Sequence, residues 1–308
     1  MKEGHNWGWP IASYLFLGGL GGGMIVVVGL ADLAFDRGEP FSLGSLIAGI
    51  AIAIGSALLI FELGRPFQFW RVLSRQKAIM TAGAWLLSFT IVTSFAYFSF
   101  WPEFSPWRQL VGLRHLAAGI NIVLGLGVCI YTGILLGSLR TRAFWNTPLL
   151  PVLFLVSGIS TGVAAQSLLA GSWPCHVPAS EIGAVHAALR SCDLALLIFE
   201  LILVFVYIGM MRFSAGPVTA RIAAQWLTGR MRWPFWGGLV GLGLALPGVL
   251  YGLSSGASGE AAPFLVLIGG VVLRFLVVYS DERARLPGES EYYARLPGPD
   301  APFLKAWE

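Results

Sequence analysis

The sequence predicts an all-α fold, a polytopic membrane helix bundle with about eight transmembrane helices. Of the 308 residues, 56% are hydrophobic and only 12% are charged, against roughly 25% charged in an ordinary soluble domain. The mean hydropathy is +0.74. The apolar residues gather into eight runs of roughly 20 residues, the length at which a helix crosses a bilayer. These observations exclude a soluble globular fold.

Glycine, proline and charged residues bound each apolar run. A run of this length without strict alternation favours a helix over a strand, and lipid offers no partner for the backbone polar groups of an open strand. The expected helices cover residues 11–34, 44–63, 80–100, 113–138, 148–170, 184–211, 234–253 and 261–279. We expect one bundle domain over residues 1–280 and a polar tail over residues 281–308.

Basic residues predict the orientation of this bundle. Eight spans place both termini on one side, together with the loops after the second, fourth and sixth helices. Fifteen basic residues lie on that side and four lie on the other, and cytoplasmic loops of membrane proteins carry such an excess. Both termini are therefore expected in the cytoplasm. The fifteen are Lys2, Arg65, Arg71, Arg75, Lys77, Arg140, Arg142, Arg212, Arg221, Arg230, Arg232, Arg283, Arg285, Arg295 and Lys305.

Several common kinds of site are not expected in this protein. Cys129, Cys175 and Cys192 have no C-x-x-C spacing, so they predict neither a disulfide framework nor a metal or iron–sulfur site. The glycines between Gly18 and Gly23 lie inside an apolar run, where small residues favour close helix packing over phosphate binding. Nucleic-acid-binding motifs are absent from the sequence.

The sequence has four histidines, which limits haem binding. His5 is terminal and His176 lies in an expected loop. His115 and His186 both lie at the non-cytoplasmic ends of their expected helices. One haem between these two stays open as an alternative, whereas a transmembrane pair of haems needs more histidines than the sequence supplies.

Five polar residues recur on one face of the sixth expected helix, at spacings of four, three, seven and seven. They are His186, Arg190, Asp193, Glu200 and Tyr207. Charged residues inside a membrane are costly and usually face the bundle interior. As structure, Arg190 neutralises Asp193 and Arg274 of the last span neutralises Glu200. As function, the residues from His186 to Glu200 relay protons or line a wet cavity.

Long motifs spread along the sequence support a family resemblance. The sequence is similar to the NrfD/PsrC family of polysulfide-reductase-type integral membrane subunits. The motifs are Trp9–Gly18, Glu62–Pro66 continuing to Phe69–Arg71, Tyr131–Leu136, Trp145–Phe154, Ser157–Gly162, and Leu273–Phe275, with His186 and Glu200 between the last two. The resemblance covers nearly all of the expected spans.

The resemblance implies a subunit in a bacterial or archaeal cytoplasmic (inner) membrane, without a haem or iron–sulfur cluster of its own. Such a subunit passes electrons between an exchangeable quinone, menaquinone by family habit, and a peripheral four-cluster ferredoxin-like iron–sulfur subunit. That partner serves a molybdopterin or multihaem catalytic subunit in anaerobic respiration. The terminal substrate belongs to the catalytic subunit, so this protein would act only as part of a complex.

The same resemblance places the quinone near the first, second and fourth helices. The matching positions are Tyr14, Glu62 and Tyr131, with Arg65 adjacent, and Tyr14 stands where some members have a histidine. We expect the two tyrosines to hold the quinone head group and Glu62 to exchange protons, since quinone chemistry moves two protons with two electrons. Glu62 can also form an ion pair with Arg65 at the end of its helix. Two alternative functions are ion translocation along the sixth helix and passive anchoring.

Overall fold

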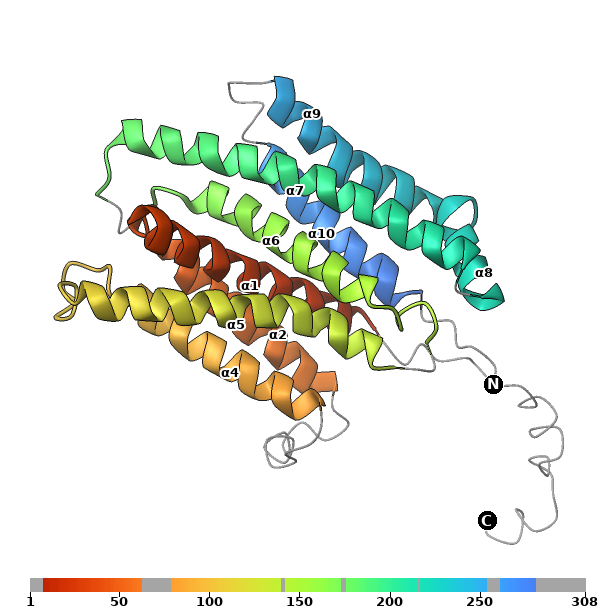
Figure 1. Ribbon diagram of the computed structural model, residues 1–308, viewed down its shortest axis with the longest axis horizontal. Coiled ribbons are helices and arrows are strands. Elements are labelled where there is room, and N and C mark those ends of the chain that lie inside the picture. The colour runs from red at the N-terminus through yellow and green to blue at the C-terminus, as the bar shows by residue number, and fades with distance from the viewer. Residues whose placement is uncertain are drawn as a thin grey trace, which may run out of the picture.

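Every regular element that the structure describes is a helix. The structure is a computed structural model and describes residues 8–62, 79–139, 142–172, 176–214, 216–253 and 261–280. Long helices lie side by side across the molecule (Figure 1). Their bounds are α1 Trp9–Phe35, α2 Ser42–Glu62, α4 Ile79–Phe98, α5 Val111–Gly137, α6 Leu149–Leu169, α7 Ala179–Phe213, η3 Pro234–Ala245 continued by α9 Leu246–Leu253, and α10 Ala262–Val278. Two short helices, η1 Glu39–Phe41 and α8 Pro217–Leu227, lie between them.

The lengths of these helices fit a bilayer. Within the described ranges, seven helical segments are long and apolar enough to cross a membrane. The eighth, α10, has 17 residues, about 25 Å at 1.5 Å per residue. Its one charged residue is Arg274, which is completely buried in the bundle. The predicted bundle of about eight membrane helices is therefore confirmed.

Helix α1 lies at the centre of the bundle, packed against α2, α5 and α6. Its glycines bring the backbones of α1 and α6 together. A Cβ atom at Gly23 would lie 2.7 Å from the carbonyl carbon of Gly158, and one at Gly162 would lie 2.7 Å from the Cα of Gly23. The predicted role of the first helix's glycines in close packing is confirmed, as expected for small residues between membrane helices.

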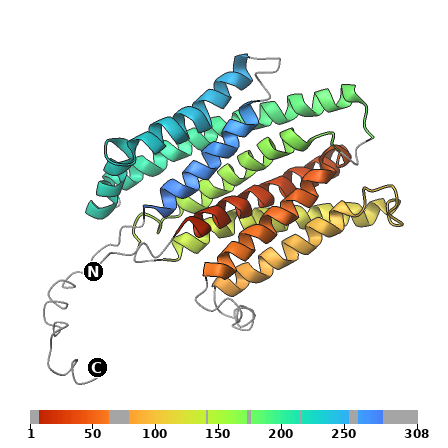
Figure 2. The same cartoon turned by 180° about the vertical axis from the view of Figure 1, so that it is seen from behind.

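The C-terminal helices form the other side of the bundle, as Figure 2 shows from behind. Helix α10 packs against η3, α6 and α1, and α7 packs against α6 and α9. Here too glycines face each other, because a Cβ atom at Gly269 would lie 3.0 Å from the carbonyl carbon of Gly243. We call the end of the bundle at which α1 begins and α10 ends the terminal end.

Three features differ from the sequence prediction. The span over residues 234–253 begins as a π-helix, η3, and becomes α-helical only at α9. Apolar periodicity could not distinguish the two types, because every residue of η3 is apolar or glycine. The sixth expected helix starts five residues earlier, at Ala179. Helix α8 was not expected, since its 11 residues mix polar and apolar side chains and bury only one face.

Candidate functional site

Tyr14 of α1 and Tyr131 of α5 lie together near the terminal end. Tyr14 is completely buried, and its hydroxyl has no hydrogen-bond partner among the described residues. Tyr131 is 8% exposed and belongs to the same apolar cluster. The two phenols lie close enough to interact electrostatically. A buried hydroxyl without a partner is uncommon in a native protein and requires an explanation.

Glycines on neighbouring helices make room for the two tyrosines. The ring of Tyr131 occupies the space that a side chain at Gly83 of α4 would fill. A Cβ atom at Gly55 of α2 would lie 3.5 Å from Cδ2 of Tyr14, and one at Gly18 would lie 4.0 Å from Cε2 of the same ring. Four helices therefore enclose this pair, and three of them are the helices predicted from the family resemblance.

Of Glu62 and Arg65, the other two residues predicted for the quinone site, the structure describes only the backbone of Glu62. Glu62 is the last residue of α2, and α2 ends at the terminal end beside the start of α1 (Figure 1). The backbone of Glu62 therefore lies at the end of the bundle that holds Tyr14 and Tyr131. The side chain of Glu62 and the whole of Arg65 lie outside the described residues.

The polar face of α7 points into the bundle. Asp193, Glu200 and Tyr207 are 1%, 3% and 1% exposed, while His186 and Arg190 are half-buried. Apolar residues on the opposite face of α7, such as Ile198 and Ile202, are exposed. The predicted sharing of one face is confirmed. Buried charges at such depth are normally paired or hydrogen-bonded.

Asp193 and Arg190 both bind Tyr251 of α9. Asp193 accepts hydrogen bonds of 2.9 Å from the hydroxyls of Tyr251 and Ser160. Arg190 donates from Nε to the backbone carbonyl of Tyr251 at 2.7 Å, and its Nη2 donates to the same oxygen. The interpretation in which Arg190 simply neutralises Asp193 is therefore wrong, because the guanidinium of Arg190 donates its hydrogen bonds to the backbone carbonyl of Tyr251.

Glu200 and Arg274 meet at Ser157 of α6. Nη1 of Arg274 donates to the Ser157 hydroxyl, and Glu200 lies near enough for the charges of Glu200 and Arg274 to attract each other. Nη2 of Arg274 donates to the carbonyl of Phe154 at 3.3 Å, and the guanidinium lies 4.8 Å from the centre of the Phe154 ring. A Cβ atom at Gly19 would lie 3.1 Å from Nη2, so Arg274 reaches α1 about a turn and a half from Tyr14. The hydrogen bonds of Arg274 therefore go to α6, and the predicted pairing with Glu200 is an attraction between nearby buried charges.

A second buried acidic group, not identified from the sequence, lies at the opposite end. Asp32 of α1 is completely buried and accepts hydrogen bonds from the Tyr97 hydroxyl at 2.9 Å and from Nε of Arg114 at 3.1 Å. Nη2 of Arg114 lies 3.0 Å from the other oxygen of Asp32 and 2.6 Å from Asp36. Nε2 of His115 lies 3.8 Å and 3.5 Å from the same two carboxylates.

Arg114 decides how this group should be interpreted. Asp32, Asp36 and His115 are near enough to one another to share a metal ion. The guanidinium, however, already places a positive charge between the two carboxylates, which is the charge that a metal would supply. The group is best explained as a structural ion pair. His115 is also turned toward these carboxylates, which does not favour the alternative of a haem between His115 and His186.

Comparison with known proteins places the protein in a family. A family model described as polysulphide reductase, NrfD, matches residues 1–281. The C subunit of polysulfide reductase from Wolinella succinogenes is 34% identical over 303 residues, covering 90% of the present sequence and 94% of that subunit. The protein NrfD of Escherichia coli is 29% identical, with 90% of the present sequence and 95% of that protein covered. The protein is therefore a multi-pass membrane protein that belongs to the NrfD family.

Proposed function

We propose that this protein is the quinone-interacting membrane subunit of a respiratory oxidoreductase complex. In this role it passes electrons between a quinone pool, menaquinone by family habit, and a peripheral iron–sulfur subunit. The observation that carries the proposal is the buried Tyr14 hydroxyl, which lacks a partner among the described residues beside Tyr131 at the terminal end. A quinone carbonyl would supply the missing acceptor in an otherwise apolar setting, which is the usual composition of a small-molecule site.

A bound quinone would supply two-electron chemistry coupled to two protons. The protein's own residues would then position the ring and handle the protons. Tyr14 donates to one carbonyl and Tyr131 stands at the edge of the same site. Glu62, at the end of α2, exchanges protons with the cytoplasmic surface, and Arg65 stabilises its charged form. No redox centre of the protein itself takes part in this scheme.

The proposed partners follow from the family and from the loop charges. A four-cluster ferredoxin-like subunit would dock at the terminal end, and a molybdopterin or multihaem subunit would carry the terminal chemistry. The excess of basic loops supports a cytoplasmic location for this end in a bacterium or archaeon, with the bundle in the inner membrane. A reporter fused to either terminus should be active only inside the cell, and activity outside would reverse this orientation.

Binding of a hydroxyquinoline N-oxide, a quinone analogue, to the purified protein tests the proposal. A hydrogen bond is worth about 0.5–1.5 kcal/mol, so Tyr14→Phe should weaken binding about 2- to 10-fold. Tyr207→Phe is the matched control, because that hydroxyl already donates to the carbonyl of Phe144 at 2.5 Å and lies on α7. Equal affinities of Tyr14→Phe and Tyr207→Phe for the analogue would contradict the proposal, as would no binding by the natural protein. The protein would then be a passive anchor.

Glu62→Gln separates proton exchange from binding. In the assembled complex this variant should bind the analogue but lose quinone-linked turnover, because the amide cannot exchange the proton. Unchanged turnover in a fully assembled complex would contradict the role of Glu62. The binding result for Tyr14 is independent of this outcome.

Ion or proton translocation along α7 is a second candidate function. It is favoured by the near-complete burial of Asp193 and Glu200 on one face of a membrane helix, since such residues often mark ion pathways. The path would run from His186 through Arg190 and Asp193 to Glu200. Charge movement in liposomes that contain the complex, lost in Glu200→Gln, would support it. Quinone-linked turnover without charge movement would restrict these residues to a structural role.

A further inference from the structure

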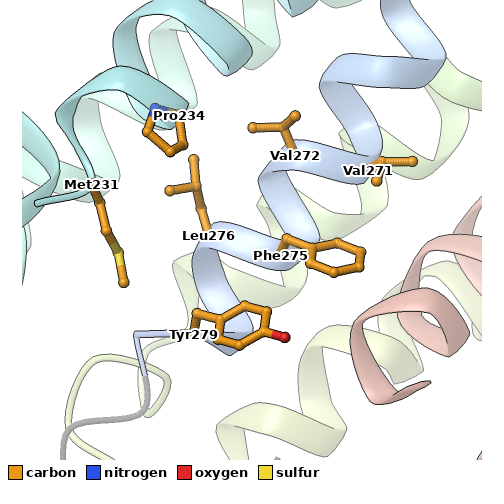
Figure 3. Close-up of a pocket in the computed structure, with 7 residues that line it drawn as sticks. All are labelled: Met231, Pro234, Val271, Val272, Phe275, Leu276 and Tyr279. Atoms are coloured by element: carbon orange, nitrogen blue, oxygen red, sulfur yellow. The ribbon is translucent and has the colours of Figure 1, made fainter. Parts of the chain in front are cut away.

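An apolar cavity of about 340 Å³ opens between the start of η3 and the last turns of α10. Met231 and Pro234 form one wall, and the other is formed by side chains from the last turns of α10 and by Tyr279, the residue that follows it (Figure 3). The cavity is open to the surface along much of its length, and all of its lining surface is apolar. Its position on a helix pair in the membrane makes it a surface groove that lipid can reach.

The lining determines what the groove can bind. Val272, Phe275 and Leu276 offer only carbon atoms. Tyr279 also lines the cavity, but its hydroxyl adds no polar surface to it, so the carbonyls of a quinone head group find no partner there. The groove is therefore suited to a hydrocarbon tail and not to a redox-active ring. It is also separate from Tyr14 and Tyr131, which are enclosed by α1, α2, α4 and α5.

Charge identifies the head group attached to that tail. Arg232 and Trp233 lie between Met231 and Pro234 in the sequence, directly beside two residues that line the groove, and both are exposed. The guanidinium of Arg232 lies 5.6 Å from the centre of the Trp233 ring. Arg230, also exposed, lies one residue before Met231. Tryptophan and arginine at the end of a membrane helix are typical of the head-group region, where arginines attract anionic lipids.

We propose that this groove is a binding site for an anionic phospholipid. One acyl tail lies between η3 and α10, and the phosphate is bound by Arg230 and Arg232 at the terminal end. The site does not depend on the proposed quinone chemistry. A lipid bound in this groove lies at the junction of η3 and α10. Helix α10 also contains Arg274, which is buried in the centre of the bundle.

Native mass spectrometry of the purified full-length protein tests the proposal. The protein is equilibrated in detergent with equal amounts of phosphatidylglycerol and phosphatidylcholine of the same acyl composition, and the retained lipid is counted. We expect the natural protein to retain one phosphatidylglycerol in preference. Val272→Trp, which fills the groove, should lower retention roughly tenfold or more, because each displaced methylene is worth about fourfold in affinity. The matched control is Val206→Trp, on the exposed face of α7.

Two further measurements keep the result open to refutation. Arg230→Gln and Arg232→Gln should each reduce the preference for phosphatidylglycerol about fivefold, the factor that corresponds to one interfacial arginine. Added phosphatidylglycerol should raise the Tm of the natural protein more than phosphatidylcholine does, which needs no variant to fold. Equal retention by Val272→Trp and Val206→Trp would overturn the groove as the site. Equal binding of the two lipids by the natural protein would overturn the anionic preference.

Discussion

Replacement of Gly23 by alanine should destabilise the bundle, because α1 and α6 touch there through their backbones. The new methyl group would lie 2.7 Å from the carbonyl carbon of Gly158 and 3.1 Å from the Cα of Ile159. An ordinary carbon contact is about 3.5 Å, and the carbonyl oxygen of Gly158 would lie closer to the methyl group than the carbonyl carbon does, so the helices must separate locally by at least about 0.8 Å. Neither contact is with a flexible side chain, and overpacking of this kind costs about 1–3 kcal/mol.

The expected net effect includes a smaller gain. Alanine is favoured over glycine in a helix interior by about 1 kcal/mol, which offsets part of the cost of overpacking. Gly209→Ala on α7 is the matched control, since its Cβ atom would have nothing within 4 Å and should bring only the gain. Thermal unfolding in detergent, followed by size-exclusion chromatography, should give Gly23→Ala a Tm several degrees below that of Gly209→Ala. A Tm for Gly23→Ala equal to or above the control would refute the close backbone contact.

Four other substitutions test side-chain pairings and one backbone conformation seen in the structure. Asp32→Asn should cost about 3–5 kcal/mol, because it removes the buried carboxylate that pairs with Arg114 and leaves that guanidinium only the exposed carboxylate of Asp36. Asp36→Asn, at a 75% exposed side chain, should cost less than about 1 kcal/mol. Thermal unfolding of both variants would show the difference. Tyr251→Phe removes one of the two hydroxyls bound to Asp193 and should lower stability by about 1–3 kcal/mol, and an unchanged Tm would contradict that bond. Gly171 has a φ of 79°, a conformation that disfavours alanine, and a Cβ atom there would lie 2.8 Å from Cδ1 of Ile182. The Tm of Gly171→Ala should therefore fall as well.

The membrane spans could be predicted from the sequence because their cause is local. A bilayer selects for about 20 consecutive apolar residues, and each expected helix meets that condition within its own segment. The polar face of α7 is local in the same sense, since helix geometry alone brings His186, Asp193 and Glu200 to one side. Tyr14 and Tyr131 were predicted instead from the family resemblance, and the structure places both in one buried apolar cluster.

The pairings between distant segments could not be predicted in this way. Asp32 lies within the first expected helix, but its partners Tyr97 and Arg114 are 65 and 82 residues away. Tyr251, which binds both Arg190 and Asp193, is 61 and 58 residues from them. Which charge meets which donor depends on how the helices are arranged, and hydropathy does not encode that arrangement. A polar residue inside an apolar run, as at Asp32, was nevertheless a signal that a buried partner exists.

The central place of α1 has a consequence for biogenesis. The ribosome makes this helix first, yet its glycine-lined surface is covered by α5 and α6, which are completed much later. From Phe35, the end of α1, to Leu169, the end of α6, the nascent polypeptide grows by 134 residues, about 7–27 s at 5–20 residues per second. During that interval α1 can pair with α2 but still exposes the bare backbone at Gly23 to its surroundings. The close backbone packing at Gly23 can therefore form only after α6 has been made.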